Sequence, residues 1–163
     1  MTTLKNIISS YVDKPHSAKD KKDLKNLLEQ ENNITLLEYL GQEYFPDTEV
    51  SIPIYERILE LKPNNIETII SIGSLFWLDG EYDESQKRLE IVKKMDPERV
   101  DVMGFEALIT SNLYKKIELY KKILKKDPTS ENALALLKQT ESQIKEEGGW
   151  KLVNGLPILY LKS

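Results

Sequence analysis

The sequence predicts an all-α protein, an α-solenoid built from antiparallel helix pairs. Three observations predict it. Pro63 and Pro97 stand 34 positions apart. They enclose two apolar-periodic segments that are separated by Asp79-Gly80-Glu81. An earlier segment repeats the first half of this unit at an offset of 32 positions, with Leu40-Gly41 in the place of Ile72-Gly73. Periods of this length are typical of helical repeats, because each helix pair buries its apolar face only against a neighbouring pair.

The unit between the two prolines is predicted to contain two helices. Asn65 is expected to cap the first helix, and Gly80 to end it in a left-handed or tight conformation. Gly73 and Ser85 are small where the two helices should approach closely. Apolar and small residues recur at the helical spacings of three and four, namely Ile66, Ile69, Ile70, Gly73, Phe76 and Trp77 in the first helix and Tyr82, Ser85, Leu89, Val92 and Met95 in the second.

These residues resemble the tetratricopeptide repeat family. The positions that carry the resemblance are Ile69, Ile72-Gly73, Phe76, Gly80-x-Tyr82, Ser85, Leu89, Val92 and Pro97. Two of them depart from the family pattern, since Ile69 replaces a Trp or Leu and Ser85 replaces an Ala, but both keep the size class. The resemblance implies stacked helix pairs whose first helices line a concave groove, and it implies protein–protein binding as the class of function.

The rest of the chain can be aligned with this repeat unit. We expect a degenerate helix pair in residues 1–30, repeats in 31–62, 63–96 and 97–127, a capping helix in 128–147 and an apolar tail in 148–163. In the first repeat the second helix is expected to open at Ser51 or Ile52, which would place Pro53 in its first turn. In the third repeat the first helix, about 98–110, is expected to be shortened by most of a turn.

The tail does not fit the repeat pattern. Asn154-Gly155 lies between two apolar runs, which is a hairpin signal. A β-hairpin and simple packing of the tail on the last helices are equal alternatives.

Charge is unevenly distributed along the 163 residues. Residues 31–112 carry a net charge of −10, between a first segment of +2 and a last segment of +4. An acidic surface attracts basic partners and opposes nucleic acid. The chain has no cysteine, no apolar run long enough to span a membrane and no signal-peptide pattern at its start. We therefore expect a cytoplasmic protein that binds neither membrane nor nucleic acid.

Residues for catalysis are missing from the sequence. The one histidine, His16, has no titratable neighbours at helical spacing, and no phosphate-binding loop, nucleophile elbow or zinc motif is present. We expect no catalytic residue, no metal site and no cofactor. Six lysines between Lys115 and Lys126 accompany Tyr114 and Tyr120. A solvated outer helix face is favoured for them over a nucleic-acid patch.

The resemblance also implies which residues face a partner. They are Glu38, Gln42 and Phe45 in the first repeat, Glu67, Ile70, Ser74 and Trp77 in the second, and Asp101 and Phe105 in the third. Trp77 is the preferred anchor for a partner, with packing against the next repeat as an equal alternative. The leading hypothesis is an adaptor or scaffold that binds a basic or amphipathic protein segment in an acidic concave groove. One alternative is an immunity-type inhibitor that neutralises a basic toxin or enzyme. The other is a structural unit that forms homo-oligomers through residues 149–163.

Overall fold

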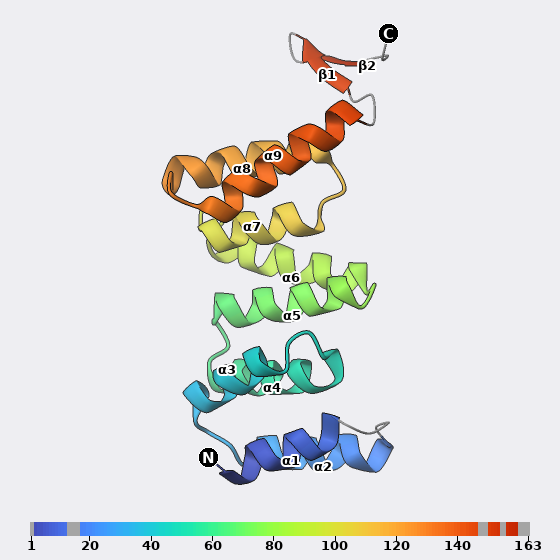
Figure 1. Cartoon of the computed structure of the whole chain (residues 1–163). Helices are drawn as coiled ribbons and strands as arrows, with labels where there is room; N and C mark the ends of the chain where they lie inside the picture. Colours follow the sequence, from blue (N-terminus) through green and yellow to red (C-terminus); the bar gives the residue numbers. More distant parts are fainter. Residues whose placement is uncertain (1, 13–16, 147–149, 154–155, 160–163) are drawn as a thin grey trace. The chain divides into compact units, whose positions relative to one another are not determined.

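The protein is described by a computed structural model. The structure describes residues 2–12, 17–146, 150–153 and 156–159, so His16 and the predicted hairpin turn Asn154-Gly155 lie outside the described residues. The described residues are mostly helical (Figure 1), and the chain divides into two compact units, Met1–Met95 and Asp96–Ser163. The helices of the first unit are α1 (Thr2–Val12), α2 (Ala18–Glu29), α3 (Ile34–Glu43), α4 (Thr48–Leu61), α5 (Ile66–Leu78) and α6 (Tyr82–Met95).

The first unit is organised as helix pairs. Helix α3 packs on α4 and α5 packs on α6, while α4 also contacts α5 and α2. One apolar core joins helices α1 to α5. Its buried residues are Leu4, Ile8, Tyr11, Leu24, Leu28, Leu36, Leu37, Leu40, Val50, Ile54, Tyr55, Ile58, Ile72 and Leu75.

Both ends of α5 form as predicted. The Asn65 side chain accepts a hydrogen bond from the Thr68 backbone N–H at 3.3 Å, which caps the first turn. Gly80 has a φ of 83°. Its N–H donates to the Trp77 carbonyl at 3.2 Å, and the next N–H, that of Glu81, donates to the Phe76 carbonyl at 2.8 Å. These two bonds satisfy carbonyls that the end of the helix would otherwise leave unpaired.

Small residues allow the paired helices to approach closely. A Cβ added to Gly41 of α3 would lie 2.6 Å from the ring of Tyr55 on α4. Tyr55 is only 5% exposed, so its ring cannot move out of the way. Ser51 and Ser85 occupy the same place in α4 and α6, and both are completely buried.

One detail of the prediction is wrong. Helix α4 begins at Thr48 rather than at Ser51 or Ile52, because Asp47 caps it by accepting the Val50 N–H at 3.3 Å. Pro53 therefore lies in the second turn, where it has no N–H to donate to the carbonyl four positions back. Tyr82, which has the helical spacing of the buried residues of α6, is the first residue of that helix and is 64% exposed.

The second unit contains α7 (Val100–Ile109), α8 (Leu113–Lys126) and α9 (Glu131–Glu146). Helix α8 packs on both α7 and α9. Their common core consists of Met103, Ala107, Leu119, Tyr120, Ile123, Ala133 and Leu137. Helix α7 has 10 residues against 13 in α5, so the shortening predicted for this helix is confirmed.

Two short strands follow, β1 (Trp150–Val153) and β2 (Leu156–Leu159). They pair antiparallel, with Trp150 opposite Leu159 and Val153 opposite Leu156.

Gly41→Ala should destabilise the first unit. The added Cβ overlaps a buried ring, an overpacking that costs about 1–3 kcal/mol, and the better helix propensity of alanine offsets about 1 kcal/mol of it. Gly104→Ala in α7 is the matched control, since nothing lies within 4 Å of its added Cβ. That variant should gain about 0.5–1 kcal/mol. Urea unfolding measures both, and equal effects would contradict the close approach at Gly41.

Ser85→Ala should stabilise the chain. The Ser85 hydroxyl is buried and has no hydrogen-bond partner among the described residues. At the equivalent position, the Ser51 hydroxyl donates to the Gly41 carbonyl at 3.3 Å. Because only Ser51→Ala loses a bond, it should be less stable than Ser85→Ala by about 1–2 kcal/mol in chemical unfolding. The reverse order would show that Ser85 has a partner.

Candidate protein-binding surface

Helix α3 and the residues just after it present the predicted positions of the first repeat. Glu38 and Gln42 are four positions apart, so they lie on one side of α3, and Phe45 follows the end of that helix. Glu38 is half-buried and Gln42 is exposed. The Phe45 side chain is 42% exposed, which is unusual for a phenylalanine and leaves apolar area available to a partner.

Helix α5 presents the predicted positions of the second repeat. Glu67, Ile70, Ser74 and Trp77 lie along one side of this helix, since their spacings are three, four and three. Glu67 is exposed and the other three are half-buried. Trp77 is therefore partly accessible and partly packed, so the structure is compatible with both of the roles considered for it. We call these four residues, together with Glu38, Gln42 and Phe45, the α3–α5 surface.

The predicted positions of the third repeat lie in the second unit, and one of them is wrong. Phe105 is only 3% exposed, so its ring has almost no surface to offer a partner. Counted from the helix starts, the α5 residues Glu67, Ile70 and Ser74 correspond to Asp101, Gly104 and Leu108 of α7, so Phe105 lies one position away from the matching side. Asp101 is half-buried, and its two carboxylate oxygens lie 2.8 and 3.0 Å from the Arg99 Nε. The charge of Asp101 is therefore already paired with the charge of Arg99.

Sequence reasoning missed a polar link between α1 and α3. The Lys5 ammonium lies 2.8 Å from a Glu43 carboxylate oxygen and donates to the Tyr39 hydroxyl at 3.0 Å. Ser9 and Tyr44 share a further hydrogen bond of 2.8 Å. The hydrogen bond from Lys5 lowers the pKa of the Glu43 carboxyl. This acid is consequently paired within the fold, and no helical periodicity could have indicated a partner 38 residues away.

Exposed apolar side chains next to the predicted positions were also missed. Tyr39 is 46% exposed and Leu78 is 52% exposed, each beside a predicted surface residue in sequence. Leu78 could have been found from its place in the last turn of α5, directly before the acidic turn Asp79–Glu81.

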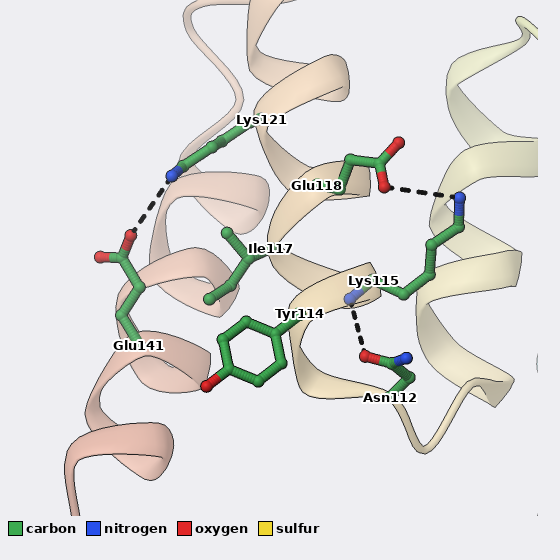
Figure 2. A pocket seen from close by; sticks show the side chains of 7 residues that line it. All are labelled: Asn112, Tyr114, Lys115, Ile117, Glu118, Lys121 and Glu141. Carbon is green, nitrogen blue, oxygen red and sulfur yellow. Dashed lines mark hydrogen bonds and ion pairs between the residues drawn. The ribbon is translucent and has the colours of Figure 1, made fainter. Parts of the chain in front are cut away.

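Three surface hollows of the described residues lie away from the predicted positions. Two are in the first unit, one of about 300 Å³ beside Tyr11 and Ile52 and one of about 160 Å³ beside Leu28 and Arg57. The third is in the second unit, measures about 590 Å³ and lies between α8 and α9 (Figure 2). The α3–α5 surface is thus none of these hollows, and its residues are exposed or half-buried. Within the described residues no group of three or more His, Cys, Asp or Glu could hold a metal ion.

Comparisons with known proteins are sparse. No protein-family model and no curated protein matches the chain. Among solved structures, one described as a point mutant of MamA is similar over 85% of this chain and 90% of that chain, with 17% sequence identity and a TM-score of 0.47. A TM-score this low supports no conclusion about fold or function. No helix among the described residues has the length and apolar character needed to cross a membrane.

Phe105→Ala and Phe45→Ala form a matched pair that tests the corrected assignment. Phe105 is 3% exposed, so its truncation should cost about 3–5 kcal/mol of stability. Phe45 is 42% exposed, so its truncation should cost about 1 kcal/mol or less. Chemical unfolding followed by circular dichroism separates the two values. Equal costs would mean that Phe105 is as accessible as Phe45.

Proposed function

We propose that the chain is a non-enzymatic protein-interaction module of the tetratricopeptide type, which binds a basic or amphipathic protein segment on the α3–α5 surface. The observation that carries this proposal is the combination of accessible apolar side chains with acidic ones on that surface. Phe45 is 42% exposed, and Ile70 and Trp77 are half-buried beside the exposed Glu67. A partly exposed aromatic side chain is a frequent anchor in protein interfaces.

The charge of the surrounding segment favours a basic partner. Residues 31–95 contain thirteen acidic and six basic side chains. Two of the basic ones form ion pairs within the fold, Arg57 with Glu60 at 2.7 Å and Lys87 with Glu84. A net negative field raises the association rate of a positive segment and lowers that of a negative one.

The helix-pair organisation of the first unit supports the family assignment. Two consecutive pairs, α3–α4 and α5–α6, have small buried residues at matching places, Gly41 with Ser51 and Gly73 with Ser85. The proposed solenoid arrangement places the first helix of each pair on the binding side. Function in this arrangement needs no titratable group with unusual chemistry, in keeping with the expectation that the protein is not an enzyme.

A binding assay with charge-reversed variants tests the proposal. The probe is a labelled peptide of about 15 residues built from Lys, Leu and Ala, which is long enough to form a helix on binding. The double variant Glu38→Lys/Glu67→Lys should weaken binding by about ten-fold or more, because attraction is replaced by repulsion at two positions. Trp77→Ala should weaken binding to a similar degree, about ten-fold, if the ring is an anchor. Fluorescence anisotropy measures the dissociation constants.

The matched control is Glu56→Lys/Glu90→Lys. It changes the net charge by the same amount, but its two exposed residues lie on the second helices, α4 and α6. This control should weaken binding by less than about three-fold, the share expected of the long-range field alone. Equal losses in both double variants would show that net charge, and not the α3–α5 surface, governs binding.

A further inference from the structure

Helix α8 has a strongly basic composition that the proposed function does not use. It contains six lysines and a single acid, Glu118. The lysines are Lys115, Lys116, Lys121, Lys122, Lys125 and Lys126. The segment is therefore opposite in charge to residues 31–95.

Acids of the second unit compensate only part of this charge. Lys122 lies 2.9 Å from Glu118, and Lys126 lies 3.1 Å from Glu98. Lys115 also approaches Glu118, but at 3.7 Å. The hydrogen bond from Lys122, with the charge of Lys115, lowers the pKa of the Glu118 carboxyl, so this acid is ionised and shared between two lysines.

Other lysines of α8 are weakly paired or unpaired. Lys121 approaches Glu141 only to 3.9 Å. Lys116 and Lys125 form no ion pair with any residue that the structure describes. Four lysines thus share three acids, and the helix keeps a positive excess.

The hollow between α8 and α9 lies beside these lysines. It has a volume of about 590 Å³ and is lined by Asn112, Tyr114, Lys115, Ile117, Glu118, Lys121 and Glu141. Figure 2 shows the ring of Tyr114 and the side chain of Ile117 next to each other on the side of α8 that faces α9. Both are half-buried and supply the apolar part of the lining. We call this site the α8–α9 hollow.

The two ion pairs at the rim of the hollow are the longest of those on α8. At 3.7 Å for Lys115–Glu118 and 3.9 Å for Lys121–Glu141, both are beyond hydrogen-bond distance. Exposed pairs of this kind contribute little to stability, about 0–1 kcal/mol. Both lysines can therefore turn to an incoming carboxylate at little cost to the fold.

We propose that the α8–α9 hollow is a second interaction site, which binds an acidic amphipathic protein segment. An apolar side chain of that segment packs on Tyr114 and Ile117, and its carboxylates pair with Lys115 and Lys121. The positive excess of α8, the helix that also forms the apolar lining, favours an acidic partner. The lining itself contains Lys115 and Lys121 together with Glu118 and Glu141. Nucleic acid fits less well, since the apolar side chains of Tyr114 and Ile117 would meet no complementary group on its phosphate backbone. The site is independent of the α3–α5 surface and takes a partner of the opposite sign.

The test uses a labelled peptide of about 15 residues built from Glu, Leu and Ala, titrated with the full chain. Lys115→Gln/Lys121→Gln should weaken binding by about five-fold or more, the value of two exposed ion pairs. The control Lys93→Gln/Lys94→Gln removes the same charge from α6 in the first unit and should change binding by less than about two-fold. Lys94 and Lys121 are exposed and Lys93 and Lys115 are half-buried, and thermal melts should show that every variant still folds.

Three outcomes would overturn the proposal. The first is that the acidic peptide does not bind, or binds both double variants equally. The second is that a single-stranded oligonucleotide displaces the peptide and itself loses affinity in Lys115→Gln/Lys121→Gln, which would assign the hollow to nucleic acid. The third is that sedimentation shows dimers of the chain that this double variant abolishes, which would make a second copy the occupant. Saturable peptide binding that depends on Lys115 and Lys121, without either of the last two results, supports it.

Discussion

The first unit depends on one steric constraint, the close approach of paired helices at positions where a side chain is absent or small. Gly41 faces the ring of Tyr55 at a distance that leaves no room for a Cβ. Ser51 and Ser85 are fully buried at matching places of α4 and α6. Interiors of proteins are packed as densely as organic crystals, so a larger side chain at these places would separate the helices and expose the core they share.

Helix packing decides which residues remain accessible to a partner. The buried sides of α3 and α5 contribute Leu37, Leu40, Ile72 and Leu75 to the core. The other side of α5 carries Ile70 and Trp77, and Phe45 follows the end of α3; all three are only partly covered. Because apolar area that the fold does not bury is available for association, the α3–α5 surface follows from the same pattern that stabilises the helix pairs.

Acidic and basic residues are concentrated in different parts of the chain. Ion pairs within each unit decide how much of their charge is left to act on a partner. Glu43 is paired with Lys5, and Asp101 with Arg99, so neither acid adds fully to the negative field. In the second unit, Glu118 pairs with both Lys115 and Lys122, so α8 keeps a positive excess. Exposed pairs add little to stability. In the functions proposed above, these pairs would act on partner selection, because they set how much charge each surface presents.

The sequence alone determined the elements. Helix periodicity, the Asn65 cap and the left-handed Gly80 follow from local chemistry, so they could be predicted without any distant contact. Periodicity also placed Glu67, Ile70, Ser74 and Trp77 on one side of α5, where Glu67 is exposed and the other three are half-buried. The tertiary structure decided the contacts between residues that lie far apart in the sequence, which no local pattern can indicate. The earlier start of α4 is not such a case, because its Asp47 cap is a local interaction like that of Asn65. Phe105 is buried although its spacing suggested a place that faces a partner, and Lys5 pairs with Glu43, 38 residues away. The proximity of Lys5 and Glu43 exists only after folding, because the two residues lie far apart in the chain.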